Sequence, residues 1–180
     1  MSSQAEISGP RLAPIQFSPT DTWFALHVRT NHEKSVCSAL REKGFETFLP
    51  TVGLTRRWKD RVVSLDTPLF PGYAFSKFDS QRPLPVLRTN GVLQVLGYGS
   101  RPSAVPVDRL SAILRMTTIG SRAVPFPYLR IGQRINVRTG PLAGLDGILV
   151  RRKGLRYLVV SIDILNRSVA TEIDLADIKP

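Results

Sequence analysis

A proline-containing break near residue 120 divides this chain of 180 residues into two unequal parts. The break, at 120–129, contains Pro125 and Pro127 with one residue between them. Proline fixes φ and removes a backbone donor, so a segment of this kind interrupts regular structure. We therefore predict a linker here, between a larger domain at 21–119 and a smaller domain at 130–180.

The segment that precedes the larger domain, at 1–20, holds three prolines and has no net charge. We predict that it is a flexible tail. The larger domain then follows the order strand, helix, strands, helix. Its first strand is expected at Thr22–Val28, and its first helix between an N-cap at Asn31 and a stop at Gly44. This order predicts an α+β fold in which helices pack on one face of a sheet.

The smaller domain has a different pattern, because its apolar residues alternate with polar ones. Alternation with period two is typical of half-buried strands. Four or five short strands with turn residues between them predict a small β-barrel. The alternating positions are Ile135 and Val137, Ile148 and Val150, Leu158, Val160 and Ile162, and Val169, Thr171 and Ile173.

The chain carries a formal net charge of +11, which favours a polyanionic partner such as nucleic acid. No apolar run approaches the roughly 20 residues that a membrane-spanning helix needs. The one cysteine, Cys37, cannot form an internal disulfide. We therefore expect a reducing, cytoplasmic compartment and no membrane contact.

Candidate catalytic and metal sites are weak. His27, His32 and Cys37 are five residues apart, and a helix would not bring them to one face. The glycine-rich run 140–147 lacks the Lys-Ser/Thr ending of a phosphate-binding loop. We expect a protein that is not an enzyme and has no cofactor or metal ion.

The segment Leu69-Phe70-Pro71-Gly72-Tyr73-Ala74-Phe75 has aromatic side chains on both sides of a Pro-Gly step. Proline and glycine inside a strand pattern indicate a bulge or an edge. Two interpretations stay open: Phe70 is either an anchor for a protein partner or an ordinary core residue.

These residues resemble a known family. The larger domain is similar to the N-terminal domain of NusG, through Trp23-Phe24-Ala25-Leu26, Glu33, Leu40, the segment from Leu69 to Phe75, and Gly91-Val92. The smaller domain resembles a KOW motif and the rest of its SH3-like barrel, through Gly132, Val137, Gly140-Pro141, Gly144 and Gly147. The resemblance implies a ferredoxin-like variant for the larger domain and covers residues 21–180. The connection at 57–71 is similar to that of the specialised RfaH, LoaP and UpxY-type antiterminators.

The resemblance also implies a function. In this family the N-terminal domain binds the clamp helices of the RNA polymerase largest subunit and reduces pausing or termination. The residues that correspond to the polymerase-binding region are Phe70, Tyr73, Phe24 and His27. The candidates for contact with non-template or upstream DNA are Arg29, His32, Arg56, Arg57, Lys59 and Arg61. The candidates for contact of the barrel with a small-subunit ribosomal protein or Rho are Ile164, Leu165, Asn166 and Arg167.

Two further expectations concern the resting state of the protein. It is expected to be a monomer, and its barrel to be β-structured at rest, because β-branched residues and glycines oppose a helical form. The alternative function is an RNA-binding structural KOW protein of a ribosomal or ribonucleoprotein assembly. That alternative accounts for the charge and the barrel but leaves the segment from Leu69 to Phe75 unexplained.

Overall fold

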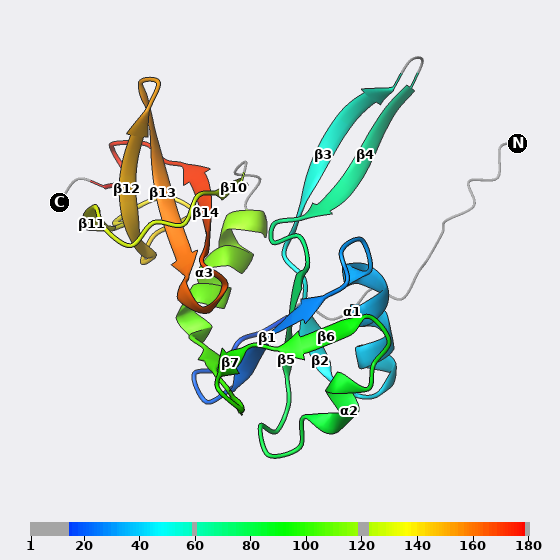
Figure 1. The fold of residues 1–180 in the computed structure, drawn as a ribbon. Helices are drawn as coiled ribbons and strands as arrows, with labels where there is room; N and C mark the ends of the chain where they lie inside the picture. The colour runs from blue at the N-terminus through cyan, green and yellow to red at the C-terminus, as the bar shows by residue number, and fades with distance from the viewer. Residues whose placement is uncertain (1–14, 59–60, 119–122, 179–180) are drawn as a thin grey trace, which may run out of the picture.

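The computed structural model of the chain describes residues 15–58, 61–118 and 123–178 (Figure 1). The larger domain contains, in chain order, β1 (Trp23–Val28), α1 (Glu33–Glu42), β2 (Glu46–Phe48), β3 (Thr51–Trp58), β4 (Arg61–Pro68), β5 (Tyr73–Lys77), α2 (Leu84–Leu87), β6 (Val92–Val95), β7 (Gly97–Tyr98), β8 (Arg101–Pro102), β9 (Ala104–Val105) and α3 (Val107–Thr118). The smaller domain contains β10 (Val124–Phe126), β11 (Gln133–Asn136), β12 (Asp146–Arg152), β13 (Leu155–Ile162), the 3-10 helix η1 (Asp163–Leu165) and β14 (Arg167–Glu172). The α+β class predicted from the sequence is confirmed.

The central sheet of the larger domain is antiparallel, with strand order β2-β5-β1-β6 and β9 also paired with β1. Successive residues of β1 point to opposite faces. Phe24 and Leu26 pack in one cluster with residues of α1, including Leu40. On the other face, Trp23 belongs to the cluster that contains Leu110 of α3.

Helices therefore cover both faces of this sheet, and the expectation of helices on one face was wrong. The physical reason lies in β1, where residues 23 to 26 are all at most 2% exposed. A strand that is apolar on both sides needs cover on both sides. The start of the first helix also differs from the prediction. Asn31 takes a left-handed conformation with φ 66°, and His32 is the N-cap of α1.

The smaller domain is a five-stranded antiparallel sheet of order β10-β14-β13-β12-β11. Most of the alternating residues lie in the strands expected of them, and Val137 and Ile173 each lie one residue beyond the end of a strand. The β form of this domain is confirmed. Strand β10 is a correction, because its residues were assigned to the linker. Pro125 lies opposite Val169 at the edge of the sheet, where a missing amide donor is tolerated.

Helix α3 lies between the sheet of the larger domain and the small β domain (Figure 1). One buried cluster contains Leu110 and Ile113 of α3 together with Leu158 and Val160 of β13. The Arg115 guanidinium also donates a hydrogen bond of 2.8 Å to the carbonyl oxygen of Pro141. The two domains therefore share a continuous core in this conformation.

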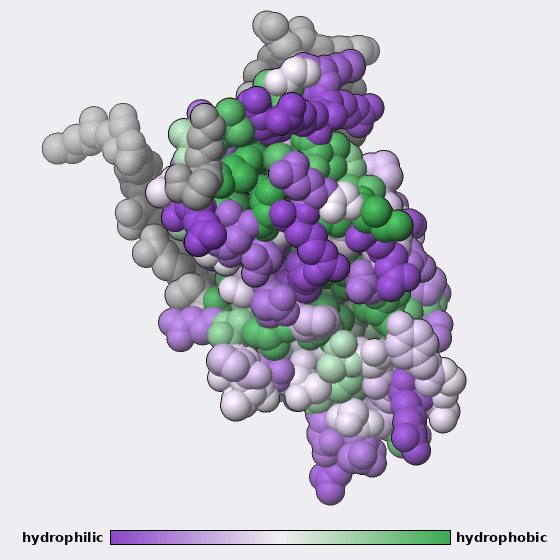
Figure 2. Space-filling model, turned by 90° about the vertical axis from the view of Figure 1, so that its left-hand side faces the viewer, coloured by the Kyte–Doolittle hydropathy of each residue, from purple (hydrophilic) through white to green (hydrophobic). Residues whose placement is uncertain are grey.

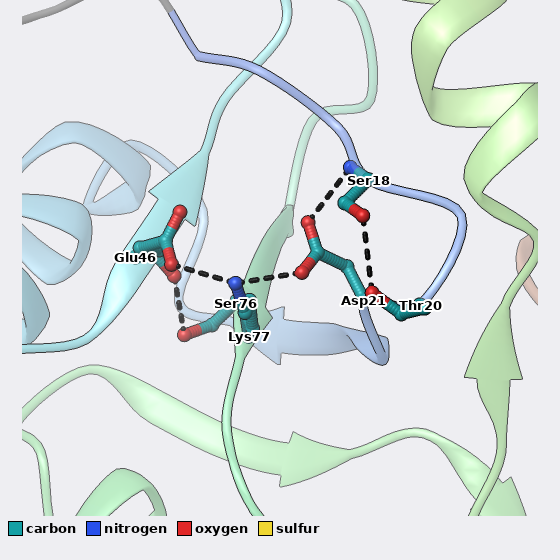
Figure 3. Close-up of polar contacts among 6 residues, drawn as sticks. All are labelled: Ser18, Thr20, Asp21, Glu46, Ser76 and Lys77. Atoms are coloured by element: carbon teal, nitrogen blue, oxygen red, sulfur yellow. Dashed lines mark hydrogen bonds and ion pairs between the residues drawn. The ribbon is translucent and has the colours of Figure 1, made fainter.

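Part of the predicted tail packs on the sheet. Phe17 makes edge contacts with Trp23 and Phe48, with ring centroids 5.1 and 5.2 Å apart. Asp21 accepts a hydrogen bond from the Ser18 amide and forms an ion pair of 2.7 Å with Lys77 (Figure 3). The tail was therefore predicted too long at its C-terminal end, because an aromatic ring there covers the core. Residues 1–14 lie outside the described residues.

Candidate functional site

The Pro-Gly step of the segment from Leu69 to Phe75 forms a tight turn held against the start of α1. Gly72 has φ 82°, a conformation that favours glycine. Its amide donates a 2.8 Å hydrogen bond to the buried carboxylate of Glu33. Its carbonyl accepts a 2.8 Å bond from the amide of Val28. The turn is thus fixed to the C-terminal end of β1 and to the first turn of α1.

Two rings lie side by side at this end of the sheet. His27 and Tyr73 are register partners in β1 and β5, and their ring centroids are 5.3 Å apart with an interplanar angle of 30°. Both side chains are half-buried. The structure therefore brings together two of the four residues expected to bind polymerase, and it leaves both partly open to solvent.

The other two residues of that set are buried, which corrects their expected role as surface contacts. Phe70 is 1% exposed and packs edge-on against Phe75, with ring centroids 5.9 Å apart. Phe24 is 2% exposed and faces α1, on the opposite side of the sheet from Tyr73. Phe70 supports the turn from inside. Phe24 is an ordinary core residue, because alternation along β1 places its side chain on the opposite face of the sheet from that of His27.

Arg29 and His32 lie in the connection from β1 to α1, and both are exposed. The Arg29 amide donates to the carbonyl of Gly91, and the Arg29 carbonyl accepts from the amide of His32. This connection is separated from His27 only by Val28, the last residue of β1. The pair of rings and the two polar side chains therefore belong to one end of the domain.

The basic run lies in a different place. Strands β3 and β4 pair only with each other in the described sheets and form a hairpin that projects from the domain (Figure 1). The register places Arg56 opposite Val63, Arg57 opposite Val62, and Trp58 opposite Arg61. Three of the candidates for DNA contact thus lie within three rungs of the hairpin turn. Lys59 lies outside the described residues.

The four residues expected to bind a partner of the barrel span η1 and the start of β14. Leu165 is 4% exposed and belongs to the core, so its expected contact is corrected. Asn166 is exposed in a left-handed conformation with φ 48°, and Arg167 is exposed beside it. Ile164 is half-buried. The 3-10 helix η1 interrupts the period-two alternation of Leu158, Val160 and Ile162, and for this reason Leu165 points inward while Ile164 stays half-buried.

Sequence reasoning missed two contributors to the candidate site. It noted Glu33 only as part of the resemblance, and nothing in the sequence indicates that its carboxylate binds the amide of a turn 39 residues away. Gln94 of β6 is exposed and lies opposite His27, on the same face of the sheet as the two rings. Its position follows from strand register, which the sequence does not provide.

Other chemical features of the described residues are few. No group of three His, Cys, Asp or Glu residues among them could hold a metal ion. Cys37 is buried in α1, and this burial raises the pKa of its thiol. None of the described helices has the length and hydropathy that a bilayer crossing requires.

Comparison with known proteins decides the family. The family model described as "Transcription termination factor nusG" matches residues 21–114, just over half of the chain. The chain belongs to the NusG family. The match covers β1 to the middle of α3, and therefore includes the two rings, the Pro-Gly turn and the projecting hairpin.

Two individual NusG proteins are similar over almost their whole length. The transcription termination/antitermination protein NusG of Halalkalibacterium halodurans is 25% identical over 173 residues, which cover 87% of this chain and 97% of that protein. A solved structure described as "Domain interaction in Thermotoga maritima NusG" shares the fold, with a TM-score of 0.51 at 16% identity. That match covers 88% of this chain and 96% of the other. Membership in a family of transcription termination and antitermination factors is thus established.

Proposed function

We propose that this NusG-family protein binds the clamp helices of the RNA polymerase largest subunit and reduces pausing or termination. The observation that carries the proposal is the pair of neighbouring rings of His27 and Tyr73, tilted by 30° to each other at one end of the sheet. An aromatic group held rigidly at a partly open position is the kind of residue that anchors protein interfaces. Binding of this kind biases the conformational equilibrium of the polymerase and requires no covalent chemistry.

The support beneath the two rings is part of the proposal. Phe70 packs in the core beneath the turn, and Glu33 binds the turn from the side of α1. Tyr73 begins β5 directly after this turn, so its backbone is fixed before any partner arrives. A preorganised anchor loses little conformational freedom on binding.

Basic and polar residues extend the proposed interface to nucleic acid. Arg29 and His32 follow β1 beside the rings, and the β3–β4 hairpin carries Arg56, Arg57 and Arg61. Lys59 belongs to the same basic run in the sequence. Arginine binds phosphates and stacks on unpaired bases. We assign these residues to the non-template strand or the upstream DNA beside the polymerase.

The small β domain is proposed to contact a small-subunit ribosomal protein or Rho. The exposed residues Asn166 and Arg167, with half-buried Ile164, form the surface of the loop before β14. Leu165 supports this loop from the core. We also propose that the chain belongs to the specialised antiterminator branch, because only the short β3–β4 hairpin separates β2 from β5.

Affinity purification tests the function as a whole. Tagged full-length protein is expressed in a bacterium and purified at physiological salt. Core RNA polymerase should remain bound to it after nuclease treatment. Retention of ribosomal subunits without polymerase would instead support the structural RNA-binding alternative and would contradict the proposal.

A further inference from the structure

A cavity of about 490 Å³ lies in the small β domain, next to the first turn of α3. Its volume falls within the range of about 300–1,000 Å³ that is typical of sites for small molecules. Strands β11, β12 and β13 contribute lining residues, as do the segment between β10 and β11 and Arg109 of α3. The cavity therefore receives residues from both domains. All of its lining residues differ from those proposed to contact polymerase, DNA or a partner of the barrel.

Three arginines line the cavity, namely Arg109 of α3, Arg130 before β11, and Arg134 of β11. Arg130 and Arg134 are exposed, and neither forms an ion pair within the described part of the chain. Arg109 is half-buried, and its Nε makes a long contact of 3.6 Å with the carboxylate of Asp108. A guanidinium group binds phosphate through two parallel hydrogen bonds and keeps its charge at any physiological pH. The three arginines therefore provide a site for the anionic group of a ligand.

Two carboxylates also line the cavity, and a neutral donor holds each of them in place. Asp146 accepts a 2.9 Å hydrogen bond from the amide nitrogen of Asn136, and Asp163 accepts one of 2.9 Å from the Tyr128 hydroxyl. An ionised carboxylate has two oxygens and accepts further hydrogen bonds. Sugar hydroxyls are suitable donors, and acidic residues bind ribose in this way in dinucleotide-binding folds. The arginines and carboxylates together match a ligand that carries both a phosphate and a sugar.

Apolar side chains form the floor of the cavity. Arg134 lies opposite Ile148 in the register of β11 and β12, and Ile148 lies opposite Val159 in that of β12 and β13. Residues directly opposite each other share one face of a sheet. Ile148 and Val159 are buried in one cluster, and half-buried Leu129 packs against it. Figure 2 views the molecule from the side of this domain and shows hydrophobic side chains at the surface among hydrophilic ones. A floor of this kind accommodates the flat ring of a nucleobase.

We propose that this cavity binds a free ribonucleotide. Arg109, Arg130 and Arg134 contact its phosphate. Asp146 and Asp163 accept hydrogen bonds from its ribose hydroxyls, and the base packs on the apolar floor. Because one of the three arginines belongs to the larger domain, a bound nucleotide favours the arrangement in which α3 packs against the small β domain. The site is separate from the rings at the end of β1 and requires no polymerase.

Isothermal titration calorimetry of the full-length protein tests the choice of ligand. The probes are AMP, GMP, CMP and UMP, compared with ribose 5-phosphate and inorganic phosphate. At least one of the nucleotides should bind at concentrations up to about 1 mM, and about tenfold or more tightly than either smaller compound. Its 2′,3′-dideoxy analogue should bind about threefold or more weakly, because the carboxylates then lack a donor. Failure of all four nucleotides to bind would overturn the proposal, as would equal affinity for ribose 5-phosphate, inorganic phosphate or the dideoxy analogue.

Substitutions test the location of the site. Arg130→Ala combined with Arg134→Ala should weaken nucleotide binding about tenfold or more, because charge-assisted hydrogen bonds to phosphate are lost. The matched control is Arg138→Ala combined with Arg151→Ala, since both arginines are exposed on the same domain and neither is a lining residue. Arg109→Ala alone should weaken binding about fivefold or more, as expected for a site that both domains share. Circular dichroism checks that each variant keeps its fold. Equal weakening by the two double variants, or wild-type affinity in folded Arg109→Ala, would overturn this assignment.

Discussion

At the scale of single residues, the contact between Glu33 and Gly72 fixes the geometry of the candidate interface. Both residues are buried, so removal of the carboxylate leaves the Gly72 amide without an acceptor. An unsatisfied buried donor costs about 1–3 kcal/mol. We expect Glu33→Ala to lower the free energy of unfolding by about this amount, measured by chemical denaturation.

Glu33→Gln should restore part of this stability, because an amide oxygen still accepts a hydrogen bond. Lys34→Ala is the matched control, since Lys34 is the exposed neighbour in the same turn of α1. If Glu33→Ala and Lys34→Ala were equally stable, the contact would not hold the turn.

A second residue-scale prediction concerns pH. Lys77 bridges Asp21 and Glu46, at 2.7 and 2.9 Å (Figure 3). The hydrogen bond from Lys77 lowers the pKa of Asp21 below its ordinary value of 3.8, and the bond to Asp21 raises the pKa of Lys77 above 10.5. The contribution of Asp21 to the stability of the folded state is therefore present above about pH 4 and is lost as pH falls through its lowered pKa. The contribution of Lys77 to the stability of the folded state is present below pH 10.5 and is lost as pH rises through its raised pKa.

Unfolding measured from acid to neutral pH should show a weaker pH dependence for Asp21→Asn than for wild type. Asp79→Asn serves as control, because Asp79 is exposed and has no ion pair among the described residues. Identical pH profiles for Asp21→Asn and wild type would show that the bridge contributes nothing.

At the scale of elements, the strands of the β domain follow from the sequence because period-two alternation reports burial directly. The sequence could not separate surface from core among the aromatic residues of the larger domain. Phe24, Phe70 and Tyr73 are chemically alike, and only strand register and the turn at Gly72 decide which of them faces solvent. The edge strand β10 was missed for a related reason, because Pro125 has the same local signature in a linker and at a sheet edge.

The β3–β4 hairpin carries the third prediction. A two-stranded hairpin without further strands is only marginally stable, so a partner for it is expected. Replacing Arg56, Arg57 and Arg61 by glutamate should reduce antipausing in a transcription assay. The slope of log affinity against log salt concentration, measured for single-stranded nucleic acid, should fall in magnitude by about 0.7 for each phosphate that the variant no longer neutralises. If antipausing activity and salt dependence were both unchanged, these three arginines would only form a solvated hairpin tip and would not bind nucleic acid.

At the scale of the whole molecule, the family assignment and the domain order were accessible from sequence, while the packing of the domains was not. Helix α3 belongs to one buried cluster that includes both the sheet and β13. A helical pattern in the sequence reveals an apolar face but not which partners cover it. The shared core and the bond from Arg115 to Pro141 are thus properties that only the structure provides.

The most direct test of the proposed polymerase binding is the affinity of core RNA polymerase for the protein with both rings removed. His27→Ala combined with Tyr73→Ala should weaken binding about 30-fold, as expected for loss of about 2 kcal/mol at an interface anchor. Tyr98→Ala is the matched control, because Tyr98 is an aromatic residue 76% exposed on the β7–β8 hairpin. Thermal unfolding of both variants establishes that they are folded at the assay temperature. We predict strongly reduced affinity in the double variant and wild-type affinity in the control, and a folded double variant with wild-type affinity would contradict the proposal.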